Sequence, residues 1–451
     1  MRHSIRFAAL LAASMAAAAF AASAQTPALA PTPPMGWNSW DAYAFTIDEA
    51  DFKANATVLA GMKNLGWNTA VIDMGWYMAN PLGEKTADQG YQLDGNGRLL
   101  PDVKRYPSAA NGAGLKSVGD WVHAQGLKFG IHIMRGIPRE AVDKNLPIAD
   151  SSFHAPEAAD PGDACPWNDG NWGVRDNAAG QAWYDSEMKL FADWGVDYIK
   201  IDCISDHPYR PTEIRQVSEA IKKTGRPIVL SLSPGPTNIT RAGEVAKYAQ
   251  LWRIGDDTWD GWTFKPNPWP NGVREGFDYL AQWYPYAGPG HWPDADMLAF
   301  GSLTPHAGWQ DARESRLTHD EVRTQFTLWA IARSPLMIGA NLTKLDDFTR
   351  SILTNKDVIA VNQTAWESAS VADLPKGFEN ARVWYALAGS RTKPIQYVAV
   401  FNLDDKPATL KASWKQLGLK GHSARELWTG KRSLSLNVTL PAHGSAIYRV
   451  K

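Results

Sequence analysis

The sequence has little cysteine, little histidine and almost no net charge. Among 451 residues there are 2 cysteines and 10 histidines, and 46 Lys and Arg balance 47 Asp and Glu. Nucleic-acid binding depends on clustered basic residues, so this balance predicts no nucleic-acid partner. The HExxH, paired CxxC and calcium-loop patterns are absent, which predicts neither a metal site nor a cofactor. Scarce histidine also gives little support for a Ser-His-Asp or Cys-His nucleophile.

Long hydrophobic runs are missing as well, except at the N-terminus. Two arginines precede an apolar run over residues 7–22, and an Ala-Ser-Ala pattern ends at Ala24. This arrangement is typical of a secretory signal peptide at 1–24, so we expect a secreted or periplasmic protein. A membrane anchor is the weaker alternative because the run is short and rich in alanine. No other run approaches the ~20 residues of a membrane span, so we expect none after signal removal.

The two cysteines, Cys165 and Cys203, would meet an oxidising compartment after export. Two thiols can form a disulfide there. The alternative is a pair of reduced, buried cysteines that behave as small hydrophobic residues.

Most of the chain alternates between short apolar runs and longer segments with helical spacing. In the first such helix, Phe52, Ala56, Leu59 and Met62 form one apolar stripe. Eight βα units in about 300 residues predict a (β/α)8 (TIM) barrel over 25–365. The expected strands are 35–40, 69–76, 128–134, 197–204, 227–234, 250–257, 291–298 and 334–342. The expected helices include 47–65, 115–125, 183–194, 212–224 and 321–333.

After Asn362 the pattern changes to short strand-like runs separated by Gly, Pro, Asp and Lys turns. No helix of comparable length lies between these runs. This predicts a C-terminal antiparallel β-sandwich domain over 366–451. The expected strands are 383–387, 397–402, 424–428, 433–440 and 445–450.

The candidate site follows from the polar residues at the strand ends. In a (β/α)8 barrel, the reacting groups come from the carboxyl ends of the strands and the loops after them. Unpaired carboxylates are costly in a core, so their accumulation at these ends indicates a cleft. They are Asp41, Asp73, Asp202, Asp256, Asp257, Asp294 and Asp296.

Aromatic residues point to the ligand of this cleft. The chain has 21 Trp, 14 Tyr and 14 Phe, and such amphipathic faces suit ligands with an apolar face and a hydroxylated rim. Sugars fit that description. Two carboxyl groups in a cleft lined by tryptophans are sufficient for glycoside hydrolysis, in which one acid protonates the leaving oxygen and one carboxylate acts at the anomeric carbon.

Five segments closely resemble family 27 glycoside hydrolases, the alpha-galactosidase (melibiase) family of clan D. They occur in the family's order and span nearly the whole chain without its signal peptide. The segments are MGWNSW (35–40), FADWGVDYIKID (191–202), WPDADML (292–298), LWAIARSPLMIGANL (328–342) and VIAVNQ (358–363). The resemblance implies a (β/α)8 barrel with a C-terminal antiparallel β-domain, in agreement with the periodicity, and a retaining hydrolase of oligo- or polysaccharides.

The resemblance also assigns the two catalytic carboxylates. Asp202 stands at the family's nucleophile, and Asp257, four residues after Arg253, stands at its acid/base. Asp256 is the competing position, and we expect strand alternation to turn only one of the two into the cleft. Double displacement would need carboxyl groups about 5 to 5.5 Å apart.

Other positions are expected to bind the sugar or support the site. Lys200, two residues before Asp202, should point the same way from its strand and hydrogen-bond sugar hydroxyls, and the alternative is a salt bridge that only neutralises the carboxylates. The family resemblance implies a substrate contact at Arg253 and sugar-pocket walls at Trp37 and Trp76. We also expect Asp73, Ser233 and Asp296 to contact substrate. In the family, a disulfide joins a cysteine near the nucleophile strand to the loop after strand three, which implies a Cys165–Cys203 pair. His132 is expected to be a hydrogen-bonded wall residue. The loop over 136–173 is expected either to cover the site or to be an elaborated surface loop.

Two positions depart from the family pattern. Alpha-galactosidases usually carry two adjacent aspartates after strand two, which read the 4- and 6-hydroxyls, and here the pair is Asp73-Met74. Many members place Cys-Glu-Trp after strand five, where this chain has a Ser-Leu-Ser segment ending at Ser233. A thioether cannot replace a carboxylate as acceptor, and a lost buried hydrogen bond costs about 1 to 3 kcal/mol.

The sequence therefore predicts hydrolysis of terminal alpha-galactosides, with other specificities in the same family as alternatives. These are beta-L-arabinopyranosides, whose ring lacks the C6 hydroxymethyl group, and isomaltose-type alpha-glucans. A non-catalytic carbohydrate-binding protein is less favoured because both carboxylates are present. A barrel enzyme acting on phosphorylated metabolites lacks a Gly-rich phosphate-binding signature.

Overall fold

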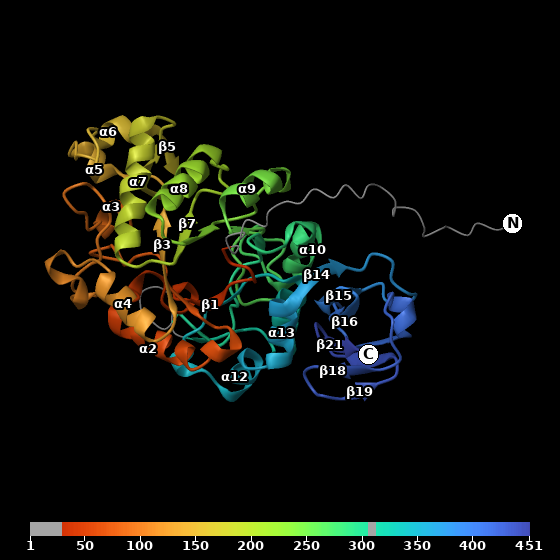
Figure 1. Cartoon of the computed structure of the whole chain (residues 1–451). Coiled ribbons are helices and arrows are strands. Elements are labelled where there is room, and N and C mark those ends of the chain that lie inside the picture. Colours follow the sequence, from red (N-terminus) through yellow and green to blue (C-terminus); the bar gives the residue numbers. More distant parts are fainter. Residues whose placement is uncertain (1–28, 305–312) are drawn as a thin grey trace.

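The computed structural model describes residues 29–304 and 313–451. The signal peptide expected at 1–24 lies outside the described residues. A barrel of parallel strands surrounded by helices is followed by an antiparallel sheet domain at the C-terminus, which lies beside the barrel (Figure 1). This architecture confirms the expected fold class. None of the helices in the described ranges combines the length and apolar character needed to cross a bilayer.

Eight parallel strands form the barrel in the order β10-β9-β8-β7-β3-β2-β1-β13. The ring closes between β10 and β13 through a parallel bridge of Leu298 with Ile338, and Leu298 N donates to Met337 O at 2.8 Å. All eight strands lie within the expected segments, and most are shorter. Their bounds are β1 (Met35–Asn38), β2 (Thr69–Ile72), β3 (Lys128–Met134), β7 (Tyr198–Asp202), β8 (Val229–Leu232), β9 (Leu251–Arg253), β10 (Trp292–Asp294) and β13 (Leu336–Ile338).

Helices cover the outside of the barrel and bury apolar stripes against it. In α8, Ile214, Val217 and Ile221 recur at helical spacing and are buried. At the start of α7, the Asn177 side chain accepts from Gly180 N, which caps the helix five residues earlier than the periodicity predicts. The main helices are α2 (Glu49–Ala60), α4 (Lys116–Ala124), α7 (Ala178–Asp193), α8 (Pro211–Thr224), α9 (Ala242–Tyr248), α10 (Val273–Trp283), α11 (His319–Ala332), α12 (Asp347–Leu353) and α13 (Lys356–Thr364).

The segment after β3 folds into a small sheet with two short helices, on the side of the barrel where the strands have their carboxyl ends. It forms a three-stranded antiparallel sheet in the order β4-β6-β5, and Figure 1 shows it beside α7. Its elements are β4 (Ile137–Pro138), α5 (Arg139–Asp143), α6 (Ala155–Ala158), β5 (Ala159–Cys165) and β6 (Asn168–Val174). Other short elements of the barrel loops are α1 (Trp40–Tyr43), α3 (Thr86–Gln89), β11 (Ser302–Leu303) and β12 (Arg313–Glu314).

The C-terminal domain consists of a six-stranded sheet faced by a two-stranded one. Along β15, Trp384 and Ala386 belong to the barrel's core cluster, whereas Val383 packs with Leu410 and Leu436 of the smaller sheet. Period-two alternation thus gives the larger sheet two buried faces. The strands are β14 (Ala365–Ser370), β15 (Ala381–Ser390), β16 (Lys393–Asn402), β17 (Ala408–Ala412), β18 (Ala424–Glu426), β19 (Arg432–Ser433), β20 (Leu436–Leu440) and β21 (Ser445–Val450). The sequence patterns did not predict β14 and β17.

Candidate active site

A cavity of about 300 Å³ opens at the carboxyl ends of the barrel strands. Most of the residues expected to act on the substrate line it, and they come from five different strands or the loops after them. These residues are Asp73, Lys200, Asp202, Ser233, Arg253, Asp257 and Asp296. The barrel therefore brings together side chains that are far apart in the sequence.

Asp202 is the last residue of β7, and its carboxylate faces the cavity. Oδ1 accepts from Cys203 N at 2.9 Å, and Oδ2 lies 3.6 Å from His132 Nε2. Burial raises the pKa of Asp202, but His132, Lys200 and the Cys203 N–H outweigh this effect and hold the pKa below its ordinary value. Asp202 is therefore ionised at neutral pH, as a nucleophilic carboxylate must be.

Asp257 lies in the loop after β9, where Arg253 Nη2 donates to its Oδ1 at 3.1 Å. Its side chain is 38% exposed, against 19% for Asp202, so it lies nearer the cavity mouth. Asp256 does not line the cavity, and its Oδ1 accepts from Asp257 N at 3.0 Å. The strand-alternation argument for this pair was wrong, because β9 ends at Arg253 and both aspartates follow in irregular backbone.

Asp296 and Arg253 form a buried pair in the cavity wall. Arg253 Nη2 lies 2.9 Å from Asp296 Oδ2, which also accepts from Thr258 N at 2.7 Å. Burial, together with Asp257 and Asp294 nearby, raises the pKa of Asp296 to about 6, although Arg253 opposes the shift. One guanidinium thus contacts two carboxylates of the cavity and fixes their relative positions.

Asp73 follows β2 directly and is fully enclosed by donors. Its Oδ2 accepts from Asn38 Nδ2 at 2.6 Å and from Lys200 Nζ at 3.0 Å, and its Oδ1 accepts from Met74 N at 2.8 Å. Burial raises the pKa of Asp73, but Lys200 and the other donors reverse the effect and keep the pKa far below its ordinary value. The thioether of Met74 lines the cavity beside this ionised group.

The tryptophans that line the cavity differ from the two expected. Trp37 and Trp76 are fully buried behind the cavity wall, and their Nε1 atoms donate to Ala340 O and His132 O at 2.8 Å. The expectation that they form walls of the sugar pocket is corrected, because their rings belong to the core. The indoles that reach the cavity are those of Trp40, Trp167 and Trp259.

Several further cavity residues carried weaker sequence signals. Asp41, in the short helix after β1, lines the cavity with an Oδ2 that has no hydrogen-bond partner among the described residues. Burial and the neighbouring Asp296 raise its pKa, although Lys200 acts in the opposite direction. Its position after a strand was the available signal. Trp167 lies in the turn between β5 and β6 and Asn168 is the first residue of β6, and no local pattern places that turn over the cavity.

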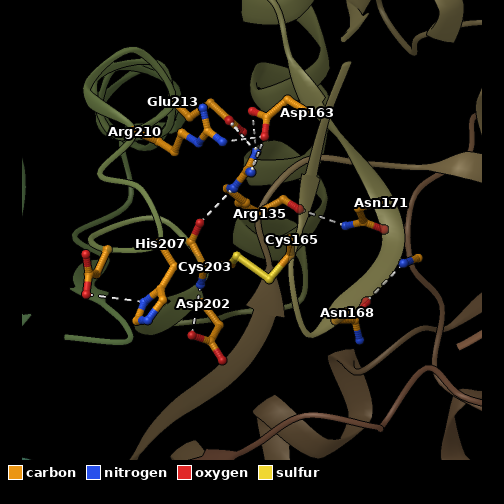
Figure 2. The surroundings of a disulfide bond; sticks show 12 residues. Arg135, Asp163, Cys165, Asn168, Asn171, Asp202, Cys203, His207, Arg210 and Glu213 are labelled. Atoms are coloured by element: carbon orange, nitrogen blue, oxygen red, sulfur yellow. Dashed lines mark hydrogen bonds and ion pairs between the residues drawn. A yellow bond between two sulfur atoms is a disulfide. The ribbon is translucent and has the colours of Figure 1, made fainter. Parts of the chain in front are cut away.

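A disulfide joins this turn to the nucleophile strand. Cys165, at the end of β5, is bonded to Cys203, the residue after Asp202, and their Cα atoms are 6.0 Å apart. Figure 2 shows the two segments meeting at the bond, with Arg135 beside it. The Arg135 guanidinium contacts Asp163 and Glu213 at 2.8 and 2.7 Å. The pairing that the family resemblance implies is therefore present.

The residues of the two described ranges contain no group of His, Cys, Asp and Glu suited to holding a metal ion. Several carboxylates line the cavity, together with the positive charges of Arg253 and Lys200. An ionised carboxylate at depth and a more exposed one near the mouth match the two roles of glycoside hydrolysis.

Comparisons with known proteins agree with this geometry. The family described as alpha galactosidase A matches residues 172–364, and the alpha galactosidase C-terminal beta sandwich domain matches residues 380–450. The chain is 31% identical to an alpha-galactosidase of Oryza sativa over 406 residues, covering 88% of this chain and 78% of the relative. It is 29% identical to alpha-galactosidase A of Cellvibrio japonicus over 449 residues, covering 94% and 92%.

Among solved structures, the chain is similar to the family 27 beta-L-arabinopyranosidase of Geobacillus stearothermophilus. That structure has a TM-score of 0.86 and 38% identity, and the match covers 94% of this chain and 97% of that one. The chain therefore belongs to glycoside hydrolase family 27, the alpha-galactosidase family, and is a retaining glycoside hydrolase.

Proposed function

We propose that the protein removes terminal beta-L-arabinopyranosyl residues by double displacement, with Asp202 as nucleophile and Asp257 as acid/base. The observation that carries the sugar assignment is Met74, which lines the cavity directly beside the ionised Asp73. In the family resemblance, the second aspartate of this pair reads the 6-hydroxyl of galactose. A methionine favours a sugar that has no such hydroxyl.

In the first step, an Asp202 oxygen attacks the anomeric carbon while protonated Asp257 gives its proton to the departing glycosidic oxygen. The bond to the leaving group breaks, and an ester forms between the sugar and Asp202. In the second step, ionised Asp257 takes a proton from water, and the water oxygen attacks the anomeric carbon and releases Asp202. Two inversions leave the configuration retained.

The surrounding charges support this division of roles. Lys200 and His132 stabilise the ionised form of Asp202, which keeps it ready to attack. Arg253 Nη2 contacts both Asp257 and Asp296, so the acid/base is positioned without being buried. Exposure near the mouth lets Asp257 exchange its proton with solvent between the two steps.

Asp73 and Lys200 select the ring configuration of the sugar by binding its hydroxyls. Their direct contact at 3.0 Å holds a carboxylate and an ammonium group in fixed positions in the cavity wall. Beta-L-arabinopyranose and alpha-galactose share the ring hydroxyls that such a pair can bind. The similarity to the beta-L-arabinopyranosidase of Geobacillus stearothermophilus supports the first sugar.

Terminal alpha-galactosides are the second candidate substrate. The relatives from Oryza sativa and Cellvibrio japonicus carry that activity in their names, and Asp73 keeps one of the two aspartates that the family pattern places here. Ser233, at the other specificity position, lines the cavity with a small side chain that leaves space for a substituent.

We also propose export through a signal peptide at 1–24. The Arg residues, the apolar run and the Ala-Ser-Ala pattern support it. The Cys165–Cys203 disulfide supports it as well, because such bonds persist in oxidising compartments.

The proposed function is tested with nitrophenyl beta-L-arabinopyranoside, alpha-galactoside and alpha-glucoside under identical conditions. We expect the highest kcat/KM for the arabinopyranoside, a lower value for the galactoside and no turnover of the glucoside. The assignment would fail if the galactoside were the better substrate or if none of the three were cleaved.

A further inference from the structure

Trp167 is an exposed indole at the cavity mouth. The residue is 46% exposed, and it lines the same cavity as Asp202 and Asp257. Of the described large hydrophobic residues with comparable exposure, it alone lines this cavity. An aromatic ring in contact with water at the rim of a site is less favourable than one covered by a ligand, so such a ring indicates a binding surface.

Covalent and polar contacts hold the turn that carries Trp167. Two residues earlier, Cys165 is bonded to Cys203. One residue later, Asn168 Oδ1 accepts from Tyr91 OH and from Gly170 N, both at 3.1 Å. Figure 2 shows Asn168 on one side of the disulfide and Asp202 on the strand that the disulfide joins to it. The turn is therefore fixed relative to the nucleophile.

The ring of His207 supports the indole from the loop after β7. The two ring centroids are 5.2 Å apart and the planes are at 88°, an edge-to-face contact. His207 Nδ1 lies 3.2 Å from Asp206 Oδ2, which limits rotation of the imidazole. One face of the indole is thus available to a ligand while its orientation is set.

Trp167 lines the same cavity as Asp257, the proposed acid/base that protonates the departing group. Both lie toward the cavity mouth, since Trp167 is 46% exposed and the Asp257 side chain 38%, against 19% for the Asp202 side chain. A group that leaves from Asp257 toward the mouth therefore meets the exposed indole.

We propose that Trp167 forms the binding site for the first sugar on the leaving-group side of the scissile bond, whose apolar ring face stacks on the indole. The inference rests on the proposed glycosidase function and names its substrate class: glycosides whose leaving group is itself a pyranose, as in oligosaccharides, rather than small alkyl glycosides. His207 and Asp206 offer polar groups to the hydroxyls at the edge of that ring.

The test compares two substrates that share the terminal sugar and differ in the leaving group. Methyl beta-L-arabinopyranoside is paired with the disaccharide beta-L-arabinopyranosyl-galactose, and methyl alpha-galactoside with melibiose. We expect Trp167→Ala to lower kcat/KM for the disaccharides about tenfold, which corresponds to about 1.4 kcal/mol, mainly through KM. For the methyl glycosides we expect a change of less than about twofold, and Trp167→Phe should retain most of the disaccharide activity.

The matched control is Trp269→Ala, which removes the indole of a residue that is 54% exposed but does not line the cavity. This variant should leave the ratio of kcat/KM for the disaccharide to kcat/KM for the methyl glycoside unchanged in both substrate pairs. Equal losses of Trp167→Ala on both members of a pair, or no loss on the disaccharide, would overturn the subsite.

Binding without turnover separates this inference from the proposed function. In the Asp202→Asn background, calorimetry should show the disaccharide binding more tightly than the methyl glycoside, and Trp167→Ala should remove that advantage. Cleavage of methyl glycosides with no disaccharide preference in binding refutes the subsite alone. Failure to cleave or bind any of the four compounds refutes the proposed function and the subsite with it.

Discussion

Arg135 Nε donates to the main-chain oxygen of Cys203, the residue that follows the proposed nucleophile, at 2.7 Å. The Arg135 N–H also donates to Asp202 O at 3.1 Å. Arg135 is the first residue after β3, so the end of one barrel strand holds the end of its neighbour. The same guanidinium contacts Glu213 and Asp163, which makes it the centre of a buried ionic network (Figure 2).

We expect Arg135→Gln to destabilise the protein by about 3 to 5 kcal/mol, because the buried Glu213 carboxylate then loses its ionic partner. The free energy of unfolding in urea measures the effect. Arg215→Gln is the control, since it removes a surface pair with Asp176 and should change stability by less than about 1 kcal/mol. Similar stabilities for the two variants would refute the network's role.

We expect Asp202→Asn to lower kcat by a factor of about 10⁴ or more, because the amide cannot form the covalent intermediate. Its thermal unfolding should stay close to that of the wild type. The matched control is Asp256→Asn, which changes an aspartate outside the cavity and should retain most activity. Wild-type turnover by Asp202→Asn would remove this residue from the mechanism.

Asp257→Asn should show a dependence on the leaving group. Without the acid, activity on glycosides of poor leaving groups should fall by about 10² to 10⁴, and substrates with acidic phenols should lose less. NMR of the first-formed wild-type product should show the same anomeric configuration as the substrate. An equal loss on all leaving groups, or a product of inverted configuration, would contradict the double-displacement assignment.

Met74→Asp should raise the ratio of alpha-galactosidase to beta-L-arabinopyranosidase activity by about tenfold, because it supplies a carboxylate acceptor where the thioether lies, and one hydrogen bond is worth about 1 to 3 kcal/mol. Comparison of kcat/KM on the two nitrophenyl glycosides gives the ratio. Met74→Leu keeps the apolar character and should leave the ratio unchanged. A ratio that does not rise in the aspartate variant would remove Met74 from the specificity site.

The barrel and the convergence of its carboxylates could be predicted from the sequence, but the ends of the strands could not. Apolar runs show that eight strands exist, whereas β9 stops at Arg253 because the chain then leaves the sheet to reach the cavity. Asp256 and Asp257 consequently do not alternate as strand neighbours. Tertiary contacts, not local pattern, decide this.

The tryptophans show the same limit. An indole is equally suited to a core and to a sugar pocket. Which of the two it occupies depends on contacts with residues far away in the sequence, such as Ala340, whose carbonyl accepts from Trp37. Trp167 could not be placed from its neighbours in sequence, since only the fold of the sheet after β3 brings its turn to β7. Cys165 carried the useful signal, because its pairing with Cys203 requires that approach.

Glu187 on α7 gives a prediction for pH dependence outside the site. Its side chain lies in the protein interior, the residue is 2% exposed, and Oε2 has no hydrogen-bond partner in the described part of the chain. Burial raises its pKa from 4.5 to about 8, and Arg98 only partly opposes the shift. The folded protein therefore keeps Glu187 protonated at neutral pH.

The sign of the effect follows from proton linkage. Below about pH 4.5 the Glu187 carboxyl is protonated in both the folded and the unfolded protein. Between about pH 4.5 and 8 it loses its proton only in the unfolded chain, so rising pH favours unfolding in this window. Glu187→Gln removes the titration and should be more stable than the wild type by a margin that grows from pH 5 to pH 8. Urea unfolding at both pH values measures the margin, and Glu219→Gln on the surface of α8 serves as control. A constant or shrinking margin would show that Glu187 ionises normally in the folded protein.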